Sequence, residues 1–271
     1  CPNKCVHCWR AIEYTTGEKI PGKIDSPSEI IDSCILSQRK LLQGFKIDKN
    51  SKKIQLSKAN QKKYKEAQEP MQFAISLSGE PTTYPYLGEL IAELRKRGKT
   101  SFLVTNGLYP EKIKELLEKN QLPTQIYISI NSSNENQYVK FHRSIKKDAW
   151  KKLNETLDIL PKLNGKTRTV FRMNLVKELN MFPEQAKEYA QLIKKSQPRF
   201  IELKSYMAVG NSRKRLGYER MPTEKDMKNF IDILLKELQG TGYKLLGEHS
   251  FSRAYVLGKD KKELKIKDSE L

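Results

Sequence analysis

The chain has 271 residues, and its 51 Lys and Arg against 32 Asp and Glu give a formal net charge of +19 at pH 7. This length suits one large α/β domain, and the absence of an eighteen-residue apolar run and of an N-terminal targeting segment argues against a membrane protein. The positive excess favours either a polyanionic partner or a solvated lysine-rich surface of the kind thermophiles carry.

The first feature along the chain is a group of three cysteines. Cys1, Cys5 and Cys8 have C-x3-C-x2-C spacing, and they are three of the four cysteines in the chain. Three thiolates in one short loop can bind three irons of a cubane 4Fe–4S cluster and leave the fourth iron open to a small molecule. The spacing therefore favours an open-site iron–sulfur cluster.

Two alternatives compete with a cluster. A structural zinc site needs a fourth ligand, for which His7 and Cys34 are the candidates, but zinc motifs usually come as two separated pairs and no second pair is present. Disulfides are the least favoured, because three crowded thiols stand in a Lys-rich chain without a signal peptide. Cys34 lies in an apolar helical stretch over 30–36, which predicts an ordinary buried thiol.

The elements predicted after the cysteines are typical of an α/β protein. Ser26 and Pro27 predict a helix start, as N-cap and first-turn proline. Residues 44–69 are rich in Lys, Gln and Asn, and they predict a polar insertion made of a surface loop and a polar helix. From Met71 onward, apolar strand-like runs alternate with amphipathic helices. The predicted strands are 72–78, 100–105, 124–130, 168–176, 200–204, 243–248 and 253–257, and the predicted helices are 87–97, 110–120, 147–160, 183–196 and 223–239.

This alternation predicts a parallel sheet with helices on its outer face, as in a partial (β/α) barrel of the α/β class. Active sites of such folds lie at the carboxyl ends of the strands, so a cysteine loop should follow a first strand. Because the motif begins at residue 1, we expect that the barrel lacks its first strand and that the sequence is truncated. We expect one domain over 1–258, with an extension on the substrate side over about 205–258, and a loosely held charged tail over 259–271.

Seven blocks of sequence occur in a characteristic order. They are KCVHCWR at 4–10, ISLSGEPT at 75–82, FLVTNG at 102–107, LPTQIYIS at 122–129, LVK at 175–177, IELKSYM at 201–207 and GNSRKRL at 210–216. The cysteine block resembles the radical S-adenosylmethionine (SAM) superfamily, in which SAM binds the open iron and is cleaved to a 5′-deoxyadenosyl radical. Together the blocks resemble the 4-demethylwyosine synthases, archaeal and eukaryotic tRNA-modifying enzymes, over essentially the whole chain.

The resemblance implies a radical SAM carbon–carbon lyase of wybutosine biosynthesis. Such an enzyme converts N1-methylguanosine next to the anticodon of tRNA-Phe, with pyruvate, to 4-demethylwyosine. It implies one 4Fe–4S cluster, SAM, an electron donor and a cytoplasmic, monomeric protein, and it favours tRNA as the polyanion. A second 4Fe–4S cluster would need an upstream segment. The alternatives are another radical SAM RNA-modifying enzyme and a non-catalytic iron–sulfur RNA-binding protein.

The end of the first predicted strand is the main candidate for SAM contact. Ser78, Gly79 and Glu80 stand there, where glycine lets a ligand approach the backbone and a carboxylate can accept from an amine. By resemblance, this block holds the SAM amino group. Without the cysteine motif, a turn with a solvated glutamate would be the simpler interpretation.

The next two strand ends offer further SAM contacts. Thr105, Asn106, Ser129 and Asn131 can hydrogen-bond the ribose or the methionine part of SAM. Asn131 stands where the family commonly has Asp, so it cannot act as a charge-assisted acceptor. Each asparagine by itself is equally typical of a turn.

Two lysines are candidates for holding pyruvate. Lys177 and Lys204 each end an apolar strand, which should place the amine at the mouth of the barrel. A lysine with a lowered pKa can bind a keto acid as a Schiff base. Binding of the SAM carboxylate, or an ion pair with Glu202 or Glu80, is the alternative for each.

Cations and aromatic residues near the strand ends are candidates for contact with RNA. Basic side chains can bind phosphates, and aromatic rings can stack on an extruded base. Trp9 beside the cysteines would also shield a cluster from solvent. The residues expected to contact RNA are Trp9, Arg10, Arg172, Tyr206, Arg213, Arg215 and His249.

Overall fold

The computed structural model describes residues 1–18, 20, 22–45 and 60–270 of the chain. A seven-stranded sheet with the order β1-β2-β3-β4-β5-β7-β6 forms its centre. Strands β1 to β5 run parallel, and β7 and β6 add antiparallel strands at one side, so the sheet of the described residues is an open, partial barrel. The strands are β1 (Gln72–Ile75), β2 (Thr100–Thr105), β3 (Gln125–Ser129), β4 (Arg168–Leu175), β5 (Phe200–Ser205), β6 (Lys244–His249) and β7 (Ala254–Gly258).

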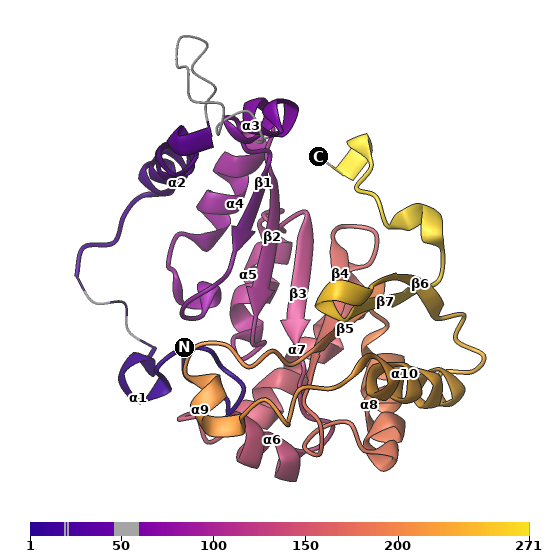
Figure 1. Cartoon of the computed structure of the whole chain (residues 1–271). Coiled ribbons are helices and arrows are strands. Elements are labelled where there is room, and N and C mark those ends of the chain that lie inside the picture. Colours follow the sequence, from indigo (N-terminus) through magenta and orange to yellow (C-terminus); the bar gives the residue numbers. More distant parts are fainter. Residues whose placement is uncertain (19, 21, 46–59, 271) are drawn as a thin grey trace, which may run out of the picture.

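Helices connect successive parallel strands and pack on one another along the outside of the sheet (Figure 1). The α-helices are α1 (Ile12–Thr15), α2 (Pro27–Leu41), α3 (Gln61–Ala67), α4 (Leu87–Lys96), α5 (Pro110–Glu118), α6 (Glu135–His142), α7 (Ala149–Leu163), α8 (Pro183–Ser196), α9 (Ser212–Leu216) and α10 (Glu224–Glu237). Short 3-10 helices are η1 (Gln43–Phe45), η3 (Pro81–Thr83), η4 (Ser250–Ser252), η5 (Lys261–Glu263) and η6 (Asp268–Glu270). None of the helices in the described ranges is long and apolar enough to cross a membrane.

The sequence predictions of the fold are largely confirmed. All seven predicted strands and all five predicted helices are present, with ends that shift by up to three residues. The helix start at Ser26 is a capping box with Glu29, and Pro27 is its first residue. The polar helix of the insertion is α3, whereas residues 46–59 of that insertion lie outside the described residues. The helices α1, α6 and α9 were not predicted, because they are short and have little apolar periodicity.

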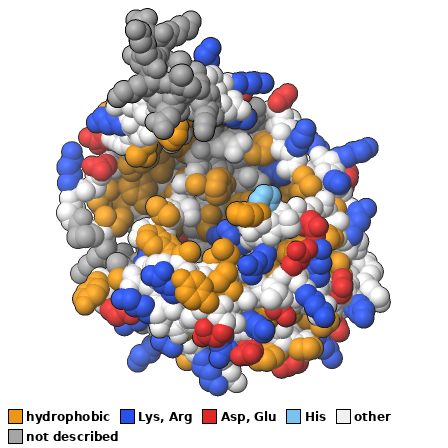
Figure 2. All heavy atoms as spheres, viewed as in Figure 1, with side chains coloured by type: hydrophobic (Ala, Val, Ile, Leu, Met, Phe, Trp, Pro, Cys, Tyr) orange, Lys and Arg blue, Asp and Glu red, His pale blue; other side chains and the backbone are white. Residues whose placement is uncertain are grey.

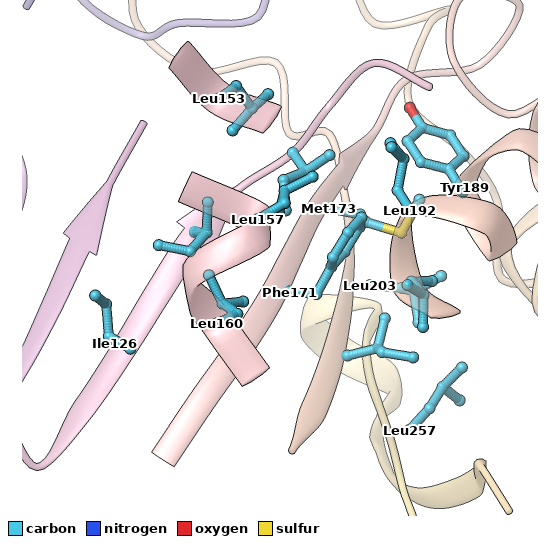
Figure 3. Close-up of a cluster of buried hydrophobic side chains, with 14 of the residues drawn as sticks. Ile126, Leu153, Leu157, Leu160, Phe171, Met173, Tyr189, Leu192, Leu203 and Leu257 are labelled. Atoms are coloured by element: carbon cyan, nitrogen blue, oxygen red, sulfur yellow. The ribbon is translucent and has the colours of Figure 1, made fainter. Parts of the chain in front are cut away.

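The core lies between the sheet and the outer helices, and β4 shows how the two faces of the sheet differ. Phe171, Met173 and Leu175 are fully buried on the helix side, where Phe171 and Met173 face side chains of α7 and α8 (Figure 3). The alternating residues Arg172 and Asn174 point to the opposite face and line a cavity there. Apolar packing therefore fixes the strands while their inner face carries polar side chains.

The charged tail is not loosely held, which corrects one expectation. The Glu270 carboxylate accepts from Arg168 Nη1 at 3.0 Å and from Arg199 Nη1 at 2.5 Å. Arg168 Nη2 also donates to the Glu263 carbonyl at 2.8 Å. The Arg168 side chain is only 3% exposed, and a buried charge of this kind needs an ionic partner and hydrogen-bond acceptors. The tail supplies the carboxylate of Glu270 and the carbonyl of Glu263, and these contacts with Arg168 hold the tail against the sheet.

Candidate active site at the carboxyl ends of the strands

A cavity of about 430 Å³ lies at the carboxyl ends of the parallel strands. The face of the molecule seen in Figure 2 is hollowed, with hydrophobic side chains lining the hollow and Lys and Arg side chains close by. Most of the predicted site residues line this one cavity. They are Cys1, Cys5, Cys8, Trp9, Arg10, Gly79, Glu80, Thr105, Asn106, Ser129, Asn131, Arg172, Lys204 and Tyr206.

The cysteine loop is fastened to the end of α6. The backbone N–H of Lys4 donates to the His142 carbonyl at 2.8 Å, and that of Val6 donates to the Phe141 carbonyl at 3.0 Å. A tight turn follows, in which Cys8 N–H donates to the Cys5 carbonyl at 3.0 Å. All three thiols are free and partly buried. The loop therefore presents its sulfurs to the cavity on a fixed backbone.

The donor set fits a 4Fe–4S cluster. In the part of the chain that the structure describes, no three His, Cys, Asp or Glu side chains converge as they would on one metal ion. A cubane makes a different demand, because each thiolate binds a different iron and the sulfurs must surround a volume. Burial raises the pKa of the Cys5 thiol to about 12, so this thiol needs a bound metal to ionise near neutral pH.

Two histidines accompany the cysteine loop: His7, half-buried within the loop itself, and His142, buried at the end of α6. His142 Nδ1 is 3.2 Å from Cys5 Sγ, and its ring stacks on Tyr138. The His7 ring stacks on Phe141 with 5.0 Å between centroids. Burial lowers the pKa of both histidines, that of His7 to about 3, so both are neutral. The contact of His142 with Cys5 was not predicted, because it depends on α6, a helix that the sequence pattern did not indicate.

Arg10 and Arg215 hold the cysteine loop, which corrects their assignment to RNA. Arg10 is 5% exposed, and its Nε donates to Cys8 Sγ at 3.1 Å. Arg215 Nε donates to the Val6 carbonyl at 3.1 Å, and Arg215 Nη2 donates to the carbonyls of Cys8 and Arg10. Both guanidiniums are therefore directed inward, where a phosphate cannot reach them without displacing these bonds.

Glu80 ties the ends of β1 and β2 together. Its Oε1 accepts from the Thr105 hydroxyl at 2.6 Å and from the Thr82 hydroxyl at 2.7 Å, while Oε2 accepts from the Asn106 N–H at 2.9 Å. Burial raises the pKa of this carboxyl, and the hydrogen bonds act in the opposite direction. Glu80 reaches the cavity wall with both oxygens already engaged, so it organises the wall even without a ligand.

Of the other predicted SAM contacts, some are hydrogen-bonded within the protein and others line the cavity. The Thr105 hydroxyl is used by Glu80, and Asn131 Oδ1 accepts from the Asn174 N–H at 2.7 Å. Asn106 Nδ2 is 3.6 Å from Cys1 Sγ, so this amide lies beside the cysteine loop. Ser129 lines the cavity from the end of β3.

Ser78 does not line this cavity. It lies on a neighbouring, mostly apolar pocket of about 470 Å³, which it shares with Cys1, Gly79, Glu80 and Cys34. Cys34 is exposed there, so its prediction as a buried thiol was wrong. Cys34 lies on a solvent-exposed face of α2, although the residues around it in the sequence are apolar.

The structure separates the two candidate lysines. Lys204 lies on β5, beside Asn174 of β4, and lines the cavity. Lys177 follows the end of β4 and does not line it; its Nζ lies 3.9 Å from Asp226 Oδ2 at the start of α10. The structure therefore favours Lys204 over Lys177 for a role in this cavity, because the chain has left β4 before residue 177 and turned toward α10.

The remaining RNA candidates also occupy different environments. Arg172 lines the cavity but pairs with Glu202, with 3.2 Å between Nε and Oε1. Tyr206 is 1% exposed in a cluster with Val6 and Phe141, so it cannot stack on a base, contrary to expectation. Outside the cavity, His249 is exposed, and its Nδ1 accepts from the Ser252 N–H at 3.3 Å as the cap of η4.

The exposed candidates gather near the cysteine loop. Trp9 is 44% exposed on the cavity wall, and Met207 and Val209 are exposed close to it. Arg213 and Lys214 are exposed on α9, which Figure 1 shows in orange beside the N-terminal loop. We call these five residues the mouth surface; it combines apolar contact area with two cations.

Two sequence families match the chain in succession. The model of the radical SAM superfamily matches residues 1–193, and a model described as wyosine base formation matches residues 195–259. The first match contains the cysteine loop and four of the parallel strands, and the second contains β5, Lys204 and α9.

Curated relatives and solved structures agree with these matches. The tRNA 4-demethylwyosine synthase of Pyrococcus abyssi is 40% identical over 260 residues, which cover 96% of this chain and 72% of the relative. That of Methanocaldococcus jannaschii is 33% identical, covering 98% of this chain and 80% of the relative. A solved structure of TYW1 with a lysine-pyruvate adduct bound superposes with a TM-score of 0.78 at 32% identity, covering 97% of this chain and 77% of that one.

Proposed function

Since the chain belongs to the tRNA 4-demethylwyosine synthase family of the radical SAM superfamily, we propose that it converts N1-methylguanosine of tRNA-Phe, with pyruvate, to 4-demethylwyosine. It is a radical SAM enzyme of tRNA modification. The observation that carries the proposal is the shared cavity, because the three thiols, the strand-end residues of β1 to β3 and Lys204 all line it.

The cysteine loop is the metal side of this cavity. Cys1, Cys5 and Cys8 would hold one 4Fe–4S cluster and leave its fourth iron to SAM. When bound, the cluster supplies the electron that cleaves SAM and starts the radical reaction. Arg10 Nε donates to Cys8 Sγ, which stabilises the thiolate form of that cysteine.

The residues at the carboxyl ends of β1 to β3 are suited to bind the ribose and the methionine part of SAM. Gly79 has a φ of +98° and no neighbour within 4 Å of a built Cβ, so its backbone is open to close approach. The Ser129 hydroxyl and the Asn106 amide face the same space, and Glu80 holds the ends of β1 and β2 in register beside it. We assign these residues to SAM, with Glu80 acting both on the wall and on the ligand.

Lys204 is the residue that we assign to pyruvate. Its amine lines the cavity, and the Arg172 guanidinium on the neighbouring strand adds a second positive charge for a carboxylate. Condensation of the lysine amine with the keto group would release water and leave an imine in reach of the cavity. The TYW1 structure with a lysine-pyruvate adduct supports this chemistry for the family without identifying the lysine in this chain.

The mouth surface is the site that we assign to tRNA. Trp9 is exposed enough to stack on an extruded base, while Arg213 and Lys214 can neutralise flanking phosphates. Its position next to the cysteine loop would bring the base to be modified toward the thiols and Lys204.

The deciding experiment is an anaerobic assay of the iron- and sulfide-reconstituted protein. With dithionite, SAM, pyruvate and N1-methylated tRNA-Phe, we expect 5′-deoxyadenosine and a tricyclic base by mass spectrometry. Omitting pyruvate should abolish the tricyclic base. RNA modification that does not depend on pyruvate would indicate another radical SAM reaction, and release of no 5′-deoxyadenosine would indicate a binding protein.

The lysine assignment has its own test. Borohydride should reduce the imine to a stable secondary amine, which peptide mass spectrometry locates. We expect the adduct on Lys204, its loss in Lys204→Ala and its retention in the matched control Lys177→Ala. An adduct elsewhere would make Lys204 a contact for the SAM carboxylate or a structural residue.

A further inference from the structure

The loop before α9 packs directly on the backbone of the cysteine loop. Asn211 N–H donates to the Trp9 carbonyl at 2.9 Å. A Cβ built on Gly210 would lie 2.5 Å from the same carbonyl oxygen, and Gly210 has a φ of +55°. Only glycine allows both this conformation and this approach. Two segments about two hundred residues apart are therefore in backbone contact at the cysteines.

Arg215 strengthens this contact from within α9. Its guanidinium donates to the carbonyls of Val6, Cys8 and Arg10, and it pairs with Glu13 at 3.7 Å. The planar fork of arginine can reach several acceptors at once, which the single ammonium of lysine cannot. Arg215 thus fixes the peptide groups on both sides of Cys8.

The same short helix also faces solvent. Arg213 and Lys214 are exposed, whereas Ser212 is buried and donates from Oγ to the Val209 carbonyl at 2.7 Å. Arg213, Lys214 and Arg215 are consecutive residues of this five-residue helix. The exposed cations and the residue that holds the cysteine loop are therefore neighbours on one short helix.

We propose that Arg215 is a positioning residue through which tRNA bound at α9 sets the conformation of the cysteine loop and, with it, the electronic environment of the cluster. The proposal rests on the proposed function for its ligand. Its physical basis is that hydrogen bonds and solvent exposure around cysteine sulfurs tune an iron–sulfur cluster. Arg215 itself touches neither the reacting atoms nor SAM.

The test compares three variants of the reconstituted protein with the wild type. They are Arg215→Gln, which removes the charge, Arg215→Lys, which keeps it, and Arg213→Gln, the matched control two residues away on α9. Binding of tRNA-Phe is measured first by fluorescence anisotropy. The electron paramagnetic resonance spectrum of the dithionite-reduced cluster is then recorded with and without saturating tRNA, together with the rate of iron loss to a chelator.

We expect tRNA to change the spectrum of the wild type. Arg213→Gln should need more tRNA but reach the same change, with an unaltered rate of iron loss. Arg215→Gln should lose iron about 10- to 100-fold faster, as is typical when a partner outside the ligand sphere is removed. Arg215→Lys should bind tRNA like the wild type, but tRNA should not change the spectrum of its reduced cluster.

Each opposite result has a distinct meaning. If the wild type binds tRNA and its spectrum stays the same, the coupling is overturned and the proposed function stands. If tRNA changes the spectrum of Arg215→Lys as it changes that of the wild type, the coupling through Arg215 is also overturned. Arg215→Lys provides this test even if Arg215→Gln cannot retain its cluster. Failure of the wild type to bind tRNA at all counts against the proposed function instead.

Discussion

The two walls of the cavity use their polar groups in opposite ways. On the strand-end wall, Glu80, Thr105 and Asn131 are engaged with one another or with backbone groups. On the cysteine wall, the three thiols form no disulfide, and the sulfurs have only weak polar contacts, with Asn106, His142 and Arg10, while Arg215 and the backbone hold the loop. The strand-end wall is complete in the protein alone, whereas the cysteine wall leaves its ligating atoms for a metal.

This difference predicts how each wall responds to mutation. Loss of a thiol should remove a ligand with little effect on the fold, because sulfur makes only weak hydrogen bonds with its neighbours. Loss of a strand-end group should cost stability as well as ligand binding, because it leaves buried donors without acceptors. The following predictions test this contrast, from the largest expected effect to the smallest.

Replacing any of Cys1, Cys5 or Cys8 with Ala should abolish the visible charge-transfer absorbance of the cluster and all SAM cleavage. Two thiolates cannot normally substitute for three in an open-site cubane. Iron analysis and 5′-deoxyadenosine release measure both losses. The control Cys34→Ala should retain both, and a stoichiometric loss of iron in that variant would identify Cys34 as a ligand.

Gly210→Ala should lower the free energy of unfolding measured in urea. The left-handed conformation costs a side chain about 1–2 kcal/mol, and overpacking against the Trp9 carbonyl costs about 1–3 kcal/mol more. Gly165→Ala is the matched control, because Gly165 has a φ of +80° and nothing within 4 Å of its Cβ. Equal destabilisation by the two variants would contradict a tight contact at Trp9.

Glu80→Ala should weaken SAM binding about ten- to over a hundredfold, since a charged hydrogen bond contributes about 1.5–3 kcal/mol. It should also destabilise the apoprotein, by about 1–3 kcal/mol for unsatisfied buried donors. Thr105→Val separates the two effects, because it removes one partner of the carboxylate and keeps the charge. Calorimetry with SAM and urea unfolding provide the readouts, and unchanged SAM affinity in Glu80→Ala argues against the assignment.

Arg213→Gln should reduce the slope of log K for tRNA against log salt by about one unit, the value for one phosphate contact. Cleavage of SAM without tRNA should not change. Lys194→Gln is the control, because Lys194 is exposed in the last turn of α8, at the end of the sheet opposite the cavity. The same change of slope in both variants would mean that tRNA senses only the net charge.

The sequence was sufficient for the order of strands and helices because apolar periodicity is a local property. It also predicted correctly that thiols and strand ends meet, since parallel strands present their carboxyl ends together. Side-chain alternation along β5 also places Lys204 on the inner face of the sheet. Lys204 has the same parity as Glu202, which lies beside Arg172 on the inner face, whereas Lys177 lies beyond the end of β4, where the alternation no longer applies.

The errors share a different cause. Arg10, Tyr206 and Arg215 were assigned to RNA because their residue types suit it. Tyr206 instead packs with Val6 and Phe141, and Arg215 binds the Val6 carbonyl, contacts that are remote in sequence. Arg10 is buried beside Cys8, only two residues away, but its burial depends on the tertiary fold. The same holds for the tail, whose attachment depends on a buried Arg168 about one hundred residues earlier. Single-residue chemistry indicates what a side chain can do, and only the tertiary contacts decide whether it is free to do it.

The long separation between the cysteine loop and its clamp has a consequence for biosynthesis. Arg215 follows Arg10 by 205 residues. At about 5–20 residues per second, a ribosome needs roughly 10–40 s to make that stretch. Throughout this time the thiols are on a nascent chain whose loop lacks the Arg215 hydrogen bonds. Delivery of iron and sulfide is therefore expected to follow release of the polypeptide, and cells must keep these cysteines reduced until then.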